Sequence, residues 1–154
     1  MAFKNIKIHF EFFQSGKQWN WTSLMGPDKK KMLEKFPVLQ FVSGARGEDI
    51  EKLWREFYRL YIILHKADLS DQEIDQFEID AQNWVRMFCR PTQGHMNSFT
   101  QVPGLYRKED ITPYMHIFAK HIPKFMRQLK EKNLSLQIFS TSSIEKKNHN
   151  QVLF

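Results

Sequence analysis

The sequence contains only one cysteine, six glycines and six prolines in 154 residues, and these low counts exclude several classes of protein. A single cysteine, Cys89, cannot form a disulfide within the chain, so we expect the reducing environment of the cytosol or nucleus. No set of cysteines and histidines has zinc-finger spacing. No glycine-rich run has the spacing of a phosphate-binding loop. Cys89 ends an apolar stripe and is predicted to be a buried small side chain.

Long apolar runs are also missing. No segment approaches the roughly 18 apolar residues that a membrane-spanning helix needs, and the lysine-containing N-terminus lacks the apolar core of a signal peptide. We therefore expect an intracellular protein, nuclear or cytoplasmic, with no membrane partner. With 42% hydrophobic and 14% aromatic residues, the chain is apolar enough to fold around one sizeable core.

Positive charge is concentrated at the two ends of the chain. The net charge of +6 divides into +4 over residues 1–36, −3 over residues 37–111 and +5 over residues 112–154. Basic ends suit a nucleic-acid backbone or an acidic protein partner. The alternative is a domain whose lysines only face water.

The apolar pattern predicts one mostly α-helical domain with a few strands (α+β) over residues 1–154. Its expected parts are a strand region at 1–25, a helical part at 27–89, a long loop at 90–110 and a helix–strand–helix segment at 111–154. Loose alternation predicts a strand over 3–13, and "WNWTSLM" is a second short strand candidate. Pro27 suits the first turn of a short helix that ends before Pro37.

Two amphipathic helices are predicted in the centre of the chain, at about 48–65 and 71–89. Ser70 and Glu73 form a capping box that starts the second helix. A short connection between such helices predicts an antiparallel helical hairpin. The apolar stripes consist of Ile50, Leu53, Trp54, Phe57, Tyr61 and Leu64 in the first helix, and of Ile74, Phe77, Ala81, Trp84, Val85 and Phe88 in the second.

The remainder of the chain is expected to contain a loop, a helix, a strand and a last helix. The loop at 90–110 has no periodicity, so it is either functional or mobile. Thr112 is a good N-cap for the following helix, and Pro123 predicts a kink within it. "LSLQIFS" (134–140) is predicted to be a buried strand, and Ser142 to cap a closing helix.

Two histidines lie five residues apart in the helix predicted after Thr112. On an α-helix five residues turn the chain through roughly 500°, so His116 and His121 should point about 140° apart and should not chelate one metal ion. One of them is expected to border the core and to hydrogen-bond a neighbouring strand or loop. A contact with a carboxylate or a phosphate is the alternative.

Acidic residues at two places in the chain are candidate sites. One group lies on the second predicted helix, where a solvated outer face is the expectation, and consists of Asp71, Glu73, Asp75, Glu78 and Asp80. The other candidate is Glu145, which follows a predicted strand and could bind a divalent cation together with other carboxylates. Ser142 to Glu145 is also an S-x-x-E capping box, and the spacing alone favours this cap.

Several segments together resemble a family of repetitive, transposon-derived animal proteins. The resemblance covers about Trp19 to Phe154 and is most specific in T-P-Y-M-H…H-x-P and in x-x-x-E-K-x-N. The other similar segments are "WTSLMGPDKKKMLEKF", "KLWREFYRLYIIL", "AQNWVRMFC" and "LQIFSTSSIEKKNHNQ". The family looks like the C-terminal part of cut-and-paste DNA transposases with a ribonuclease H-like core, similar to the hAT and Kyakuja–Dileera–Zisupton groups.

The resemblance implies a partial ribonuclease H-like fold in which the helices at 48–89 are the helical insertion. In such cores three carboxylates bind two divalent ions, Mg²⁺ or Mn²⁺. Glu145 resembles the late glutamate, with Lys146 and Asn148 beside it, and His116 and His121 resemble histidines on the preceding helix.

The same resemblance implies that the carboxylate set is incomplete in this chain. The two earlier aspartates are expected upstream of residue 1, because no aspartate precedes Asp28. One carboxylate cannot position both the attacking and the leaving oxygen. We therefore expect the chain alone to need no cofactor and to be inactive as a nuclease. The final "NQVLF" lacks a helix stop signal, which also suggests a cut boundary.

Three functions remain open from the sequence. The first is a transposase-derived, nucleic-acid-associated domain whose phosphate-contacting residues are Lys29, Lys30, Lys31, Lys120, Lys124, Arg127, Lys130, Lys146 and Lys147. The second is a helical protein-interaction or homo-oligomerisation module, with anchors or core residues Trp19, Trp21, Trp54 and Trp84. The third is a stand-alone metal-dependent nuclease that depends on Glu145.

Overall fold

The computed structural model describes residues 6–22, 24, 26–96 and 98–139. The chain is mostly α-helical with one small antiparallel sheet, so the predicted α+β class is confirmed. Its contacts define two compact units, one of Met1–Arg59 with Arg86–Asp110 and one of Leu60–Val85 with Ile111–Phe154. Within the described residues, no helix has the length and apolarity to cross a membrane.

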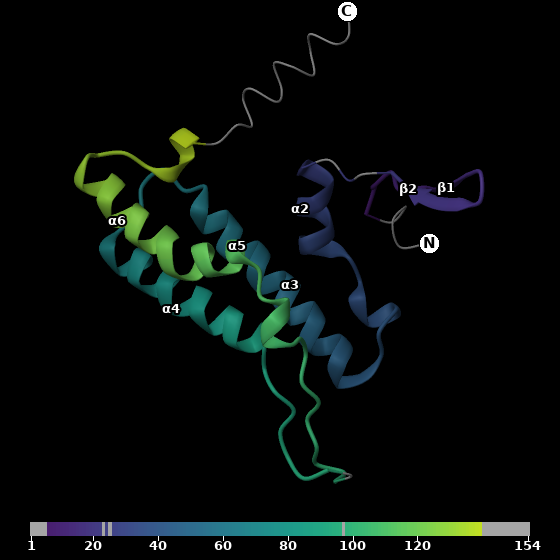
Figure 1. Ribbon diagram of the computed structural model, residues 1–154. Helices are drawn as coiled ribbons and strands as arrows, with labels where there is room; N and C mark the ends of the chain where they lie inside the picture. The colour runs from purple at the N-terminus through teal and green to yellow at the C-terminus, as the bar shows by residue number, and fades with distance from the viewer. Residues whose placement is uncertain (1–5, 23, 25, 97, 140–154) are drawn as a thin grey trace, which may run out of the picture. The chain divides into compact units, whose positions relative to one another are not determined.

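The first unit contains a β-hairpin made of β1 (Phe12–Ser15) and β2 (Gln18–Trp21) (Figure 1). The strands are antiparallel, with Ser15 opposite Gln18 at the turn. Gly16 has a φ of 62° in this two-residue turn, a conformation that glycine adopts without steric cost. The second short strand candidate, residues 19–25, is therefore confirmed only over Trp19–Trp21, since Thr22 and Leu24 are irregular.

The strand predicted over residues 3–13 is wrong over residues 6–11, and residues 3–5 lie outside the described residues. Residues 8–11 are irregular, and pairing begins only at Phe12. Lys7 has a φ of 54°, a left-handed conformation that ends any extended run at this position. Ile8 is nevertheless buried, so the alternation identified a core residue without identifying a strand.

Helix α2 (Gly26–Lys35) forms as predicted and ends before Pro37. The guanidinium of Arg55 donates hydrogen bonds to the carbonyl oxygens of Leu33 and Phe36, both at 2.7 Å. Leu33 lies in the last turn of α2, and its carbonyl has no helical donor because the residue four positions on is Pro37. Phe36 directly follows the helix. Arg55 lies on α3 (Gly44–Leu64), so this side chain attaches α2 to that helix.

The loop over residues 90–110 folds back on itself as two extended arms (Figure 1). Gln93 and Val102 form a β-bridge with two backbone hydrogen bonds of 2.9 Å. At the base of the loop, the Tyr106 N–H donates to the Phe88 carbonyl at 3.0 Å, and their rings stack with centroids 4.4 Å apart. The second arm ends in a 3₁₀ turn, η2 (Lys108–Asp110).

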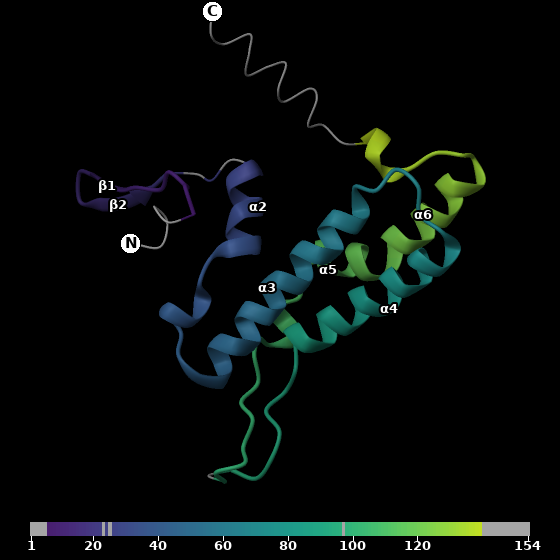
Figure 2. The ribbon, with the colours of Figure 1, turned by 180° about the vertical axis from the view of Figure 1, so that it is seen from behind.

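The second unit contains the last turn of α3, most of α4 (Asp71–Phe88) and one helical segment made of α5 (Pro113–His116), η3 (Ile117–His121) and α6 (Ile122–Glu131). Helices α4 and α6 lie side by side in both views (Figures 1 and 2). Among the described residues of this unit, those that are buried are Leu60, Ile74, Phe77, Ala81, Phe118, Ala119, Pro123 and Met126.

The apolar stripe predicted for the second helix is confirmed at its centre. Ile74, Phe77 and Ala81 are 1% exposed or less. The Phe118 ring packs edge-on against Phe77 and Trp84, with centroids 5.5 and 6.0 Å away. Such edge-to-face pairs add stability beyond the area that they bury.

The buried strand predicted at 134–140 is wrong. Residues Leu136–Phe139 form a 3₁₀ turn, η4. Asn133, just after the end of α6, has a φ of 54°. In the segment that follows, Leu134, Ile138 and Phe139 are 44%, 55% and 67% exposed. A single strand needs a neighbour for its backbone hydrogen bonds, and the described residues place none beside this segment. The closing helix predicted from Ser142 lies outside the described residues.

Candidate functional site

The helical segment with the two histidines begins as its sequence predicts. The Thr112 side-chain oxygen accepts a hydrogen bond from the Met115 N–H at 3.4 Å, and Pro113 occupies the first helical position. The cap fixes where the helix starts and therefore the register of every side chain that follows.

The interruption predicted at Pro123 takes the form of a π-helical turn. In η3 the Ile122 N–H donates to the carbonyl of Ile117, five residues back, in place of the usual four. Pro123 has no N–H for the carbonyl of Ala119, so the α-helical ladder is already incomplete here. A wider turn accommodates this gap, and single π turns of this kind are frequent at functional sites.

The π turn brings His116 and His121 together. Their ring centroids are 5.2 Å apart, with the planes at 69° to each other. The expectation that the rings point about 140° apart is therefore wrong, because it assumed α-helical geometry. Both side chains are exposed, so the expectation that one of them borders the core is also wrong.

Arg127, a predicted phosphate-contacting residue, is bonded to α4 within the second unit. Its guanidinium lies 2.7 Å from an Asp75 carboxylate oxygen and 2.6 Å from a Glu78 oxygen. The hydrogen bond to Asp75, and then that to Glu78, raises the pKa of Arg127 above its usual value. Lys130 is bonded to Asp71 at 2.7 Å. Both cations therefore join α6 to α4.

The acidic residues of α4 lie on a largely solvated face, as the sequence predicts, because the Asp71 and Asp75 side chains are 84% and 64% exposed. They also bond to neighbouring cations. Asp71, Asp75 and Glu78 accept the hydrogen bonds from α6, and Glu73 accepts one from Lys66 at 2.6 Å. The spacing of the residues explains this arrangement. Positions 71, 75 and 78 lie on one side of α4, and positions 127 and 130 lie on one side of α6. The carboxylates of α4 can therefore face the cations of α6.

The predicted capping box at the start of α4 is confirmed. The Ser70 N–H donates to Glu73 Oε2 at 2.9 Å, and the Glu73 N–H donates to Ser70 Oγ at 3.2 Å. The hydrogen bond from Lys66, with the bonds from Ser70, lowers the pKa of Glu73 from 4.5 to about 2. Glu73 thus acts as a structural carboxylate at the helix start.

Lys120 and Lys124 differ from the two cations bonded to α4. Both are exposed, and neither has a hydrogen bond or ion pair with any of the described residues. They lie four residues apart, one in the π turn and one in α6. These two lysines are the strongest candidates for contact with an anionic partner in the second unit.

The lysines of α2 in the first unit are less uniform. Lys31 lies 3.3 Å from Asp28 and donates to the Lys7 carbonyl, also at 3.3 Å. Lys29 is exposed and has no partner in the part of the chain that the structure describes. Lys30 is exposed as well. The candidates Glu145, Lys146, Lys147 and Asn148 lie outside the described residues.

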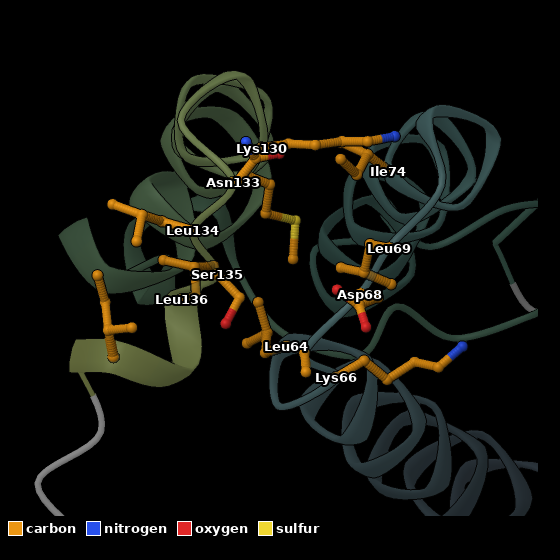
Figure 3. A pocket seen from close by; sticks show the side chains of 13 residues that line it. Leu64, Lys66, Asp68, Leu69, Ile74, Lys130, Asn133, Leu134, Ser135 and Leu136 are labelled. Carbon is orange, nitrogen blue, oxygen red and sulfur yellow. The ribbon is translucent and has the colours of Figure 1, made fainter.

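A pocket of about 420 Å³ lies in the second unit between α4 and η4 (Figure 3). Leu69 and Ile74 line one side, and Leu134 and Leu136 line the other. The two lysines at the pocket, Lys66 and Lys130, are already bonded to carboxylates of α4. The pocket is therefore lined by both apolar and polar side chains, and its two lysines serve ion pairs with α4.

The described residues contain no group of three or more histidine, cysteine, aspartate or glutamate side chains that could hold a metal ion.

Cys89 is half-buried, so the prediction of a buried small side chain is met only in part. Two of the tryptophans pack on other aromatic rings: Trp54 on Phe36 and Trp84 on Phe118. Trp19 is 63% exposed.

Comparisons of this chain with family models, with curated proteins and with solved structures find no match. The transposon resemblance therefore stays a prediction from the quoted motifs.

Proposed function

We propose that this chain is a transposase-derived, nucleic-acid-associated domain that contacts the phosphate backbone of DNA. The observation that supports the proposal is the exposed pair Lys120 and Lys124, which has no carboxylate partner among the described residues. When such lysines bind phosphate, cations condensed on the DNA are released, and this release drives nonspecific DNA binding.

The ion pairs of the second unit narrow the proposed contact set. Arg127 and Lys130 neutralise carboxylates of α4, so we assign them to the fold and remove them from the interface. Lys31 pairs with Asp28 and is removed as well. The set that remains in the described residues is Lys29, Lys120 and Lys124, with Lys30, Lys146 and Lys147 as predictions from the sequence.

The finer fold that we propose is part of a ribonuclease H-like core, with α3 and α4 as the helical insertion. Residues Leu136–Phe139 form a 3₁₀ turn where such a core has a strand. A strand requires pairing partners. The proposal therefore places those partners, and the two aspartates that would complete a two-metal site, on another polypeptide segment. We propose no nuclease activity for the chain alone.

A DNA-binding titration tests the proposal. Fluorescence anisotropy of a labelled duplex should show affinity at low salt that falls steeply as salt rises. The double variant Lys120→Ala/Lys124→Ala should reduce the slope of log K against log salt by about 2, one unit for each phosphate that is no longer bound. The control Lys52→Ala/Lys108→Ala removes the same charge from exposed lysines outside the contact set and should leave the slope unchanged.

Two outcomes would reject this function. One is the absence of duplex affinity at low salt, and the other is an equal effect of the two double variants. Plasmid cleavage with Mg²⁺ or Mn²⁺ that disappears in Glu145→Ala would instead support the stand-alone nuclease.

A second candidate function, a homo-oligomerisation or protein-interaction module, is favoured by an apolar groove on α6. Its volume is about 340 Å³, and it is lined by Phe125, Gln128, Leu129, Lys132, Leu136 and Phe139. Phe125 and Phe139 are 49% and 67% exposed. Contiguous exposed apolar surface of this kind is typical of contact sites.

Light scattering over a range of concentrations tests the homo-oligomer. The mass should rise with concentration in the natural chain and stay monomeric in Phe125→Ser/Phe139→Ser. Phe99→Ser, in the exposed loop, is the control. A monomer at every concentration would reject this version.

A further inference from the structure

The histidine pair on the π turn has the geometry of two ligands to one metal ion. In a π turn residues i and i+5 lie one above the other along the helix, since the hydrogen bond joins them. His116 and His121 are five residues apart across this turn, and their ring centroids are 5.2 Å apart. The backbone therefore holds both rings on one side of the segment.

The spacing matches what a transition metal requires. A tetrahedral ion with metal–nitrogen bonds of about 2 Å holds the centres of two coordinated imidazole rings about 5 Å apart. The observed centroid distance of 5.2 Å agrees with this geometry. The rings meet edge-on, so they do not block each other's nitrogens by stacking face to face.

The ring nitrogens are also available. Neither histidine side chain has a hydrogen bond or ion pair with the described residues, and both are exposed. Two other histidines differ: His65 bonds to the Tyr61 carbonyl at 2.8 Å, and His9 lies 3.8 Å from Glu11. Solvent reaches the pair, so water can fill the remaining coordination positions.

We propose that His116 and His121 bind one divalent late transition-metal ion, Cu²⁺, Ni²⁺ or Zn²⁺, through one nitrogen each. Imidazole suits these ions, whereas Mg²⁺ and Mn²⁺ prefer oxygen ligands. The site is therefore distinct from the carboxylate site that the transposase resemblance implies, and it does not depend on DNA binding. Affinity follows the order Cu²⁺ above Ni²⁺ and Zn²⁺.

Calorimetric titration of the untagged chain with Ni²⁺ or Zn²⁺ tests the site. We expect one ion per chain in the natural protein. Two ligands on one scaffold bind about 100-fold more tightly than one ligand, so either His116→Ala or His121→Ala should lower the affinity by about this factor. His95→Ala, which removes an exposed histidine from the loop, is the matched control and should leave the affinity unchanged.

Electron paramagnetic resonance of the Cu²⁺-loaded natural chain gives a second measurement that needs no variant to fold. Its nitrogen splitting should show two imidazole ligands. A spectrum with one imidazole, or an affinity that is the same in His116→Ala and in the natural chain, would overturn the proposal. Because an α-helical turn would separate the two rings, either result would also argue against the π turn.

Discussion

Replacement of Arg127 by methionine tests whether this side chain serves the fold or a nucleic acid. The sequence predicts that Arg127 contacts phosphate, yet it bridges Asp75 and Glu78 of α4. Methionine keeps much of the aliphatic length and removes the charge. We expect a loss of stability with no loss of DNA affinity.

The magnitude follows from the exposure of the three side chains. Exposed ion pairs contribute about 0.2–1 kcal/mol each. Arg127 is 41% exposed, Asp75 64% and Glu78 30%. The pair with Glu78 should therefore lie near the upper end of that range and the pair with Asp75 near the lower end. Together they predict a loss of about 1 kcal/mol for Arg127→Met.

Urea denaturation followed by circular dichroism measures this loss. Double-mutant cycles of Arg127→Met with Glu78→Gln and with Asp75→Asn separate the two pairs. The coupling free energy should be larger for Glu78 than for Asp75, and both should shrink in about 1 M salt, where the screening length is about 3 Å.

Two results would refute this reasoning. If both coupling energies are zero within error, the ion pairs do not stabilise the packing of α6 on α4. If Arg127→Met reduces the salt slope of DNA binding by about 1 while stability is unchanged, Arg127 belongs to the nucleic-acid interface after all.

Three further predictions concern the stability of the chain. The pKa of Glu73 is lowered from 4.5 to about 2. Its stabilising contribution is therefore present above about pH 4.5 and is lost as the pH falls toward 2. In an acid titration followed by circular dichroism, the stability of Glu73→Gln should depend less on pH in this window than that of the natural chain. A Cβ at Gly47 would lie 1.7 Å from the Val42 carbonyl oxygen, so urea denaturation of Gly47→Ala should show a loss of about 1–3 kcal/mol despite the better helix propensity of alanine. Phe77 is 0% exposed, and Phe77→Ala should cost about 3–5 kcal/mol by the same assay, against less than about 0.5 kcal/mol for the control Phe139→Ala.

The elements that were predicted correctly have strong local signals. The Ser70–Glu73 capping box and the Thr112 cap use side chains that bond to a backbone three residues away, so a short stretch of sequence contains the whole interaction. The stripe around Phe77 was also found, because helical periodicity alone reveals which face is apolar. Leu60 was missed, although it is fully buried.

The elements that were predicted wrongly depend on neighbours or on an unusual local turn. Residues 134–139 have the apolar content of a strand, but a strand also needs a partner, and the described residues provide none at this place. The strand predicted over 3–13 failed for a local reason. Lys7 adopts a left-handed backbone conformation, which a lysine residue does not predict.

The sequence by itself determined the two central helices and, for α4, the start and the apolar face, because each of these follows from side chains within a few turns of one another. Helix α3 begins at Gly44, before the predicted start at about residue 48. Only the tertiary structure decided what the charged and titratable side chains do. Whether Arg127 is neutralised depends on carboxylates about 50 positions away, at Asp75 and Glu78. Whether His116 and His121 meet depends on a single π turn, since a turn that is wider than an α-helical one brings positions five residues apart onto the same side of the helix.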